Sequence, residues 1–202
     1  MAGSGRTDRG VHALGQVATC GLPAIHTPEI LRRALNFHLP PGVRVLSIQK
    51  QPEKFHARFS AKGKIYLYRI ANTAFLHPME IGRAWHVPRP LDLRAIRQAA
   101  RLFVGKHDFA SFTSNPGYER ESTVRRLRSV RVTRKPGSLL EFSFDGDGFL
   151  YRMVRNLVGA LVKVGQGRLA VADLKKILAA RSRAGAPPTA PAEGLYLVSV
   201  RY

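Results

Sequence analysis

Residues 123–146 constrain the fold more than any other part of the sequence, because they predict a β-hairpin. The stretch TVRRLRSVRVTRK (123–135) alternates apolar and charged residues with the two-residue period of a strand. Leu127 is one residue out of step with Val124, Val130 and Val132, which predicts a bulge or a late start in this strand. Lys135-Pro136-Gly137 then predicts a turn into the partner strand SLLEFSFDG (138–146). A hairpin of this kind favours antiparallel sheet.

The rest of the chain alternates between helical and strand patterns. A helix is expected between Thr27, its cap, and Pro40, and Pro28 suits its first position. The other helical patterns cover residues 92–105, 149–165 and 171–182. The other strand patterns cover residues 15–22, 43–51, 64–72 and 194–202. The sequence therefore predicts an α+β fold with mainly antiparallel sheet, and VPRPL (87–91) resembles a linker between two lobes.

Charge indicates the class of partner. The chain has 33 Lys and Arg against 13 Asp and Glu, a net charge of +20, which favours nucleic acid first and an anionic membrane second. A soluble protein that is merely basic is the remaining alternative. Cys20 is the single cysteine, so an intrachain disulfide is impossible and a reducing compartment is expected. Without an apolar run of about 18 residues or a leader sequence, we expect a cytoplasmic protein.

The stretch GSGRTDRGVHALGQV (3–17) holds the first candidate catalytic group, Asp8. Glycines around a carboxylate allow the backbone to bend tightly and to approach a ligand closely. Arg6 and Arg9 flank Asp8 and would hold it ionised, and an ionised carboxylate can act as nucleophile or base. An Asx-turn or a helix cap is the commoner use of Asp in such a context, and His12 can equally be an ordinary loop histidine.

Two further stretches combine charge with apolar or aromatic residues. In FHARFSAKGKIYLYRI (55–70), aromatic and basic residues alternate as on a surface that stacks bases and binds phosphates. A strand with aromatics in the core and lysines in solvent explains it equally well. In FLYRMVRNLVGALVKVG (149–165), Arg152 and Arg155 share one face of an otherwise apolar helix. They need an anion, which a phosphate or Asp8 would provide, or they form an ordinary surface salt bridge.

Four segments together resemble the successive signatures of the tRNA pseudouridine synthase A family. They are GRTDRGVHALGQV, FHARFSAKGKIYLYRI, FLYRMVRNLVGALVKVG and AEGLYLVSV, in the order of the family. The resemblance implies two ferredoxin-like lobes, placed at residues 1–88 and 89–202, whose sheets join over a central cleft. It also implies an additional strand–helix–strand segment before the GRTD loop, so we expect the N-terminal lobe to be incomplete here. One departure is Arg9, where the family often has alanine.

The resemblance also implies an activity and a set of residues. The family isomerises uridine to pseudouridine at positions 38, 39 and 40 of the tRNA anticodon stem-loop, as a homodimer, without cofactor or metal. Its essential aspartate corresponds to Asp8, its active-site tyrosine to Tyr66 and its paired arginine to Arg155. Arg6 corresponds to the arginine linked to base flipping, and Leu195 to the residue that packs against the target base. The remaining residues expected to contact substrate are His12, Arg58 and Arg152.

Two other functions compete with this one. A non-catalytic RNA-binding relative would keep the fold after losing part of the active lobe, but binding alone does not require Asp8. A basic DNA-binding or ribosome-associated protein fits the charge equally well and leaves the Asp8 loop unexplained.

Overall fold

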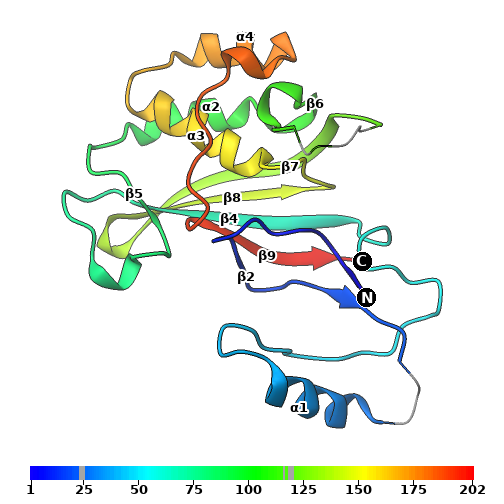
Figure 1. Ribbon diagram of the computed structural model, residues 1–202. Helices are drawn as coiled ribbons and strands as arrows, with labels where there is room; N and C mark the ends of the chain where they lie inside the picture. Colours follow the sequence, from blue (N-terminus) through cyan, green and yellow to red (C-terminus); the bar gives the residue numbers. More distant parts are fainter. Residues whose placement is uncertain (23–25, 116, 118–120) are drawn as a thin grey trace.

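The protein is an α+β fold in which helices cover one face of a seven-stranded sheet (Figure 1). The computed structural model describes residues 1–22, 26–115, 117 and 121–202. Its helices are α1 (Pro28–His38), α2 (Leu93–Arg101), α3 (Met153–Gly165) and α4 (Val171–Ala180). Its strands are β1 (Ala2–Gly3), β2 (His12–Ala13), β3 (Ala18–Thr19), β4 (Gly63–Ala71), β5 (Trp85–His86), β6 (Gly105–Asp108), β7 (Val124–Lys135), β8 (Leu139–Gly146) and β9 (Leu195–Arg201).

The main sheet has the order β2-β9-β4-β8-β7-β6, with β5 beside the end of β4. Strand β4 is antiparallel to both of its long neighbours, so Tyr66 lies between Phe144 of β8 and Leu197 of β9. Strand β2 pairs with β9 in parallel, and the separate pair β1–β3 closes the base of the first loop. Strands from both expected lobes therefore share one sheet, while the division at residue 88 and the ferredoxin-like pattern of each lobe stay predictions.

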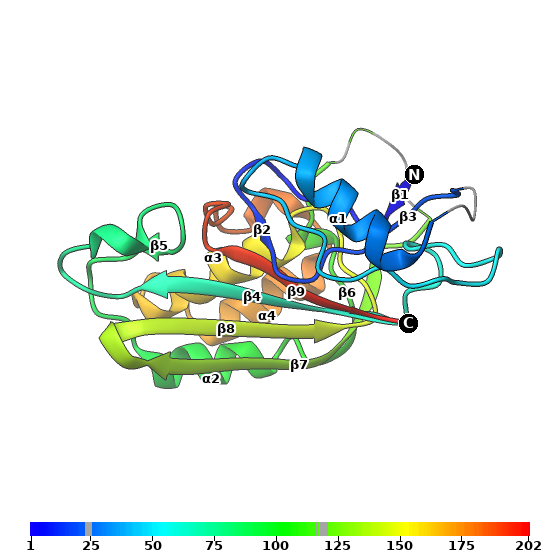
Figure 2. The ribbon, with the colours of Figure 1, turned by 90° about the horizontal axis from the view of Figure 1, so that it is seen from below.

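The core lies between this sheet and helices α2, α3 and α4 (Figures 1 and 2). Alternate residues of β8, among them Phe142 and Phe144, point to the helices and are fully buried. Helix α3 is buried along almost its whole length, which explains its nearly continuous apolar sequence. Helix α1 lies apart from the other three and buries none of its residues (Figure 1).

Several elements confirm the sequence-based expectations. Thr27 caps α1 by accepting a hydrogen bond from the Ile30 N–H, and Pro28 is its first residue. The β7–β8 hairpin forms as predicted, and its register shifts between Leu127 and Ser129, where the sequence indicates a bulge. Strands β4 and β9 and helices α2 and α4 also form where their patterns indicate, to within a few residues at their ends.

Three expectations about local structure were wrong. Residues 43–51 form no strand; the Asn36 side chain bonds both the N–H and the carbonyl of Val45, at 2.8 and 2.9 Å, in place of a neighbouring strand. The strand expected over 15–22 is reduced to β3. Helix α3 begins at Met153 rather than Phe149, because Arg152 has a left-handed backbone (φ 57°) that interrupts a helix.

Within the described part of the chain, no helix combines the length and the apolar character that a membrane span requires.

Candidate functional site

The loop that carries Asp8 is fixed at both of its ends. At its start, the buried Ser4 donates its N–H to the Val17 carbonyl at 2.7 Å and its hydroxyl to Gln16 at 2.6 Å. The Lys64 ammonium on β4 donates to the Ser4 carbonyl, also at 2.7 Å. At its far end, the backbone N–H groups of residues 14 and 15 donate to the Leu197 carbonyl on β9. The loop is thus an extension of the sheet rather than a free terminus.

Asp8 itself lies in a tight turn. Its carbonyl accepts a hydrogen bond from the Val11 N–H at 3.0 Å, and Gly10 within this turn has a φ of 83°, which glycine adopts without strain. The closest approach of a side chain at position 10 would be to Ala192, in the segment that precedes β9. The turn therefore fixes the backbone of Asp8, and the backbone of the turn at Gly10 packs against the 187–194 segment.

Two arginines from the start of α3 contact the Asp8 carboxylate. Arg155 Nη1 donates to Asp8 Oδ2 at 2.7 Å, and Arg152 Nε lies 3.5 Å from the same oxygen. The Asp8 side chain is 23% exposed, that of Arg155 13% and that of Arg152 41%. Charge-assisted hydrogen bonds of this length are among the stronger ones in proteins, and in partial burial they orient the carboxylate. One carboxylate oxygen, Oδ1, takes no part in either contact.

The backbone of another segment holds Arg155 in place. Arg155 Nε donates to the Ala190 carbonyl at 2.8 Å, and the Ala190 N–H donates back to the Arg155 carbonyl at 3.1 Å. The left-handed backbone of Arg152 turns the chain sharply just before α3, so that both guanidinium groups reach Asp8 although they are not on one face of a regular helix. The guanidinium of Arg152 also lies 4.9 Å from the centre of the Tyr151 ring.

Tyr66 on β4 lies within electrostatic reach of Asp8. Burial and, second, the negative charge of Asp8 raise the pKa of Tyr66 to about 12. Its ring meets Phe149 edge to face, with 4.9 Å between ring centres. The phenol therefore stays protonated at neutral pH and offers an aromatic surface and an O–H donor beside the carboxylate.

Leu195 and His12 have well-defined surroundings. Leu195 begins β9 opposite Tyr68 and is 7% exposed. The His12 ring stacks on Tyr196 with 4.6 Å between ring centres, and its Nε2 lies 2.8 Å from the Gly82 carbonyl oxygen. Among the described residues, no hydrogen bond joins His12 to Asp8; its contacts tie the loop to β9 and to the segment after β4.

Arg6 and Arg58 are exposed, and neither has a carboxylate partner among the residues that the structure describes. The Arg58 guanidinium lies 5.5 Å from the centre of the Phe59 ring, which is itself 76% exposed. Burial and, second, the positive charge of Arg58 lower the pKa of Lys64. Arg58 therefore lies close to Lys64, the residue of β4 that bonds the start of the Asp8 loop. Exposed cations and an exposed ring beside this loop suit a polyanionic substrate with stacked bases.

The sequence-based reasoning missed a polar network under the 187–194 segment. The Asn156 side chain on α3 is fully buried; its oxygen accepts from Thr189 Oγ1 at 2.6 Å and from Arg183 Nη2 at 3.2 Å, and its Nδ2 donates to the Phe112 carbonyl. This network fixes the segment that supplies the Ala190 carbonyl to Arg155. The signal for it was a single Asn in an otherwise apolar helix, because such a residue needs buried partners.

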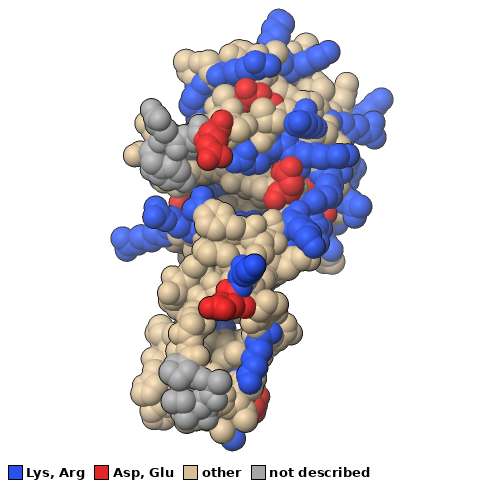
Figure 3. Space-filling view, turned by 90° about the vertical axis from the view of Figure 1, so that its right-hand side faces the viewer, with Lys and Arg blue, Asp and Glu red and all other residues tan. Residues whose placement is uncertain are grey.

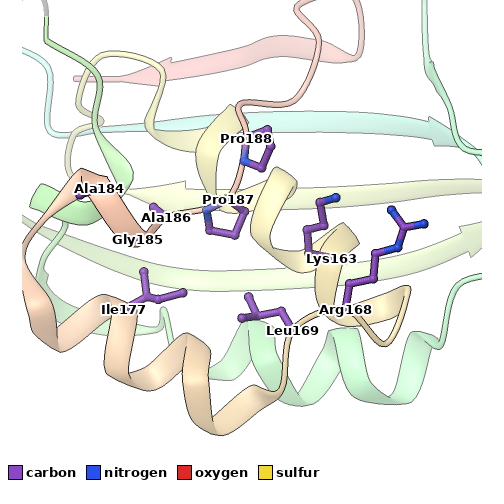
Figure 4. A pocket seen from close by; sticks show the side chains of 9 residues that line it. All are labelled: Lys163, Arg168, Leu169, Ile177, Ala184, Gly185, Ala186, Pro187 and Pro188. Atoms are coloured by element: carbon purple, nitrogen blue, oxygen red, sulfur yellow. The ribbon is translucent and has the colours of Figure 1, made fainter.

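The candidate site is open to solvent, since the Asp8 side chain is 23% exposed. A hollow of about 290 Å³ lies between the end of α3, helix α4 and residues 184–188 (Figure 4). Its lining combines two cations, Lys163 and Arg168, with apolar side chains such as Leu169 and Ile177, and it includes none of the predicted site residues. No cluster of three His, Cys, Asp or Glu side chains that suits a metal ion occurs in the described ranges.

Comparison with known proteins gives one consistent result. The profile of a family described as tRNA pseudouridine synthase matches residues 99–202. The chain is 51% identical over 202 residues to tRNA pseudouridine synthase A of Methylacidiphilum infernorum (isolate V4), covering all of this chain and 79% of that protein. It is 44% identical to the protein of the same name from Afipia carboxidovorans, over 99% of this chain and 81% of that one. Identity of this extent along the whole chain shows that it belongs to the tRNA pseudouridine synthase A family, a family of isomerases.

Proposed function

We propose that this protein isomerises uridine to pseudouridine at positions 38, 39 and 40 of the tRNA anticodon stem-loop, with Asp8 as its catalytic carboxylate. The observation that carries the proposal is the contact of Arg155 with Asp8 at 2.7 Å, between residues 147 positions apart in the sequence. A carboxylate in a loop clamped at both ends, paired with arginine on one oxygen, has its second oxygen available for chemistry. The net charge of +20 suits an RNA substrate.

The reaction exchanges one bond to the sugar for another. In a nucleophilic route, an Asp8 oxygen bonds to C1′ as the C1′–N1 bond breaks and its electron pair stays on the uracil. The uracil turns, C5 displaces the carboxylate from C1′, C5 loses its proton and N1 gains one. In the alternative route, Asp8 removes the C2′ proton while N1 leaves with the electron pair of the C1′–N1 bond, which forms a glycal. C5 then bonds to C1′ as the proton returns to C2′, and C5 finally loses its own proton while N1 gains one. Either route balances without a cofactor.

The surrounding residues take supporting roles in this proposal. Arg155 and Arg152 orient the carboxylate and stabilise its charge. Tyr66, protonated at neutral pH, and Leu195 form the slot that holds the detached uracil. The target base has to leave its stack first, and Arg6, in the same loop as Asp8, stabilises the flipped state. Arg58 binds the RNA backbone nearby, and His12 holds the loop against β9. We further propose that the protein works as a homodimer in the cytoplasm.

The test is pseudouridine formation in tRNA transcripts that carry uridine at only one of the three positions. Wild-type protein is expected to convert each of them. Asp8→Asn nearly preserves shape and removes the charge, so turnover should fall to background while tRNA affinity changes little. Asp173→Asn, at a half-exposed position of α4 outside the candidate site, is the matched control and should retain full activity.

The outcomes separate the alternatives. Appreciable turnover by Asp8→Asn would contradict the catalytic assignment. Tight tRNA binding by the wild type without any product would support the non-catalytic RNA-binding relative. Equal competition by DNA of similar length would support a general nucleic-acid-binding protein.

A further inference from the structure

A row of arginines lies on helix α2, away from the Asp8 loop. Arg94, Arg97 and Arg101 follow one another at three- and four-residue spacing, so they share the solvent face of the helix, opposite the buried Ile96. Together with Gln98 they border a hollow of about 440 Å³. In Figure 3, Lys and Arg side chains crowd the part of the molecule that holds the sheet and helices α2–α4, whereas few lie at the end that holds α1.

Strand β7 extends this row. Strand β6 pairs only with residues 124–127, so the rest of β7 has no further strand beside it among the described residues, and α2 packs along it. The Val132 carbonyl on this edge accepts a hydrogen bond from Arg97 Nε at 3.1 Å. Arg134, two residues further, is exposed and falls on the same face of the strand as Val132. We call Arg94, Arg97, Arg101 and Arg134 the α2–β7 surface.

The charges of this surface are not neutralised within the protein. None of its four guanidinium groups lies within 4.0 Å of a carboxylate in the part of the chain that the structure describes. Arginines elsewhere do pair: Arg69 with Glu80, Arg155 with Asp8 and Arg201 with Asp145. Three guanidinium groups that border one hollow, with Arg134 on the adjacent strand and no carboxylate beside any of the four among the described residues, form a site for phosphates, because guanidinium donates hydrogen bonds in a planar fork that matches phosphate oxygens.

Helix α3 separates the start of α2, which carries Arg94, from the candidate site. Arg155, near the start of α3, binds Asp8. The carbonyl of Gly165, at the end of α3, accepts a hydrogen bond from the N–H of Asp92 at the start of α2. Ten residues separate Arg155 from Gly165, which corresponds to about 15 Å along a helix. The α2–β7 surface also lies at the edge of the sheet opposite β2, which follows the Asp8 loop (Figure 2). A substrate whose reacting group is bound at Asp8 can therefore contact the α2–β7 surface only through a part of the molecule that is far from this group.

We propose that the α2–β7 surface binds the phosphate backbone of the tRNA outside the anticodon stem-loop. The inference rests on the tRNA substrate of the proposed function and adds a second contact region, remote from the target base. Such contacts carry no sequence information; they fix the orientation of the RNA and add affinity that depends on salt.

The test compares binding of full-length tRNA with binding of the isolated anticodon stem-loop. The variant is Arg94→Gln/Arg101→Gln/Arg134→Gln, which leaves Arg97 and its bond to Val132 intact. The control, Arg33→Gln/Lys54→Gln/Lys175→Gln, removes the same charge from exposed positions elsewhere. We expect the surface variant to bind full-length tRNA about tenfold more weakly, with a log–log salt slope lower by about 2–3. Its affinity for the stem-loop should match that of the control.

Each other result overturns the inference. Unchanged affinity for full-length tRNA, an equal loss for the stem-loop, or an equal loss in the control would show that this surface makes no separate contact. If the glutamine variant misfolds, arginine modification of the wild type decides: full-length tRNA, but not the stem-loop, must protect Arg94, Arg101 and Arg134 from phenylglyoxal. These readouts measure binding alone, so they are independent of whether Asp8 is catalytic.

Discussion

Arg155 donates one hydrogen bond to the Asp8 carboxylate and another to the Ala190 carbonyl, so a single guanidinium joins the first loop of the protein to the segment before its last strand. Its side chain is 13% exposed, and Asp8 is the only carboxylate within 4.0 Å of it in the described ranges. The position of the carboxylate therefore depends on two parts of the chain that lie far apart in the sequence.

Replacement of Arg155 by lysine is expected to lower kcat by about 100-fold, equivalent to ~2.7 kcal/mol of transition-state stabilisation. Lysine keeps the charge, but an ammonium group cannot reproduce the fork that contacts both Asp8 and Ala190. Arg152→Lys is the control. The Arg152 side chain is 41% exposed and its Nε lies 3.5 Å from Asp8 Oδ2, so kcat is expected to fall by less than about fivefold. Single-turnover pseudouridine formation measures both, and equal losses in the two variants would contradict the role assigned to Arg155.

Tyr66 is expected to titrate about two pH units above free tyrosine, since burial and the Asp8 charge raise its pKa to about 12. A raised pKa in the folded state stabilises the protein below pH 10, and this contribution is lost as the pH rises from about 10 to 12. Tyr66→Phe has no such group, so its free energy of unfolding relative to the wild type should increase over this range. Urea unfolding at several pH values measures the difference; a constant difference would contradict the prediction.

Gly159→Ala is expected to destabilise the protein by about 1–3 kcal/mol. In most helices this substitution stabilises by about 1 kcal/mol, because alanine is the better helix former. Here a Cβ at position 159 would collide with the Pro188 carbonyl oxygen. The collision would displace the segment that carries Ala190, so activity should fall as well.

Gly42→Ala is the control for this substitution, because nothing lies within 4 Å of the added methyl group. Thermal unfolding and single-turnover kinetics measure both variants. A Gly159→Ala protein as stable as the wild type would show that the 187–194 segment can move away from the added methyl group without loss of unfolding free energy.

Asp145→Asn is expected to lower stability by about 1 kcal/mol at neutral pH. Asp145 on β8 accepts two bonds from Arg201 and one from Arg128, and these partners lower the pKa of its carboxyl group. The stabilisation is therefore present above pH 3.8 and is lost as the pH falls below it. Unfolding free energies of wild type and variant should converge in acid; a difference that persists there would contradict the ion-pair explanation.

Local signals explain why some elements could be predicted from the sequence. Helix α1 carries its own cap and stop, Thr27 and Pro40, and the β7–β8 hairpin carries both its alternation and its turn. The segment at 43–51 has a strand pattern too, but a strand also requires a neighbouring strand as hydrogen-bond partner. Here the Asn36 side chain bonds the N–H and the carbonyl of Val45 instead. Strands β2 and β5, of two residues each, depend wholly on distant partners and leave no periodic signal.

The candidate site shows the same division. The residue types around Asp8 were recognised from the four family-like segments, and Arg152 and Arg155 were correctly expected to need an anion. The left-handed backbone at Arg152, which brings both guanidinium groups to one carboxylate oxygen, was not predictable, because arginine rarely adopts it. The hydrogen-bond partner of His12 could not be predicted either, since Gly82 is 70 residues away in the sequence.

The place of β9 between β2 and β4 has a consequence for the order in which the protein matures. On the ribosome, residues 195–201 emerge after every other strand of the sheet, and until then β2 and β4 have no common neighbour. Pairings between such remote segments form late in folding, because closing a long loop costs entropy before contacts compensate for it. The Asp8 loop, anchored to the Leu197 carbonyl, therefore becomes ordered only once translation has passed this strand. A nascent chain still short of β9 is expected to leave any tRNA it meets unmodified.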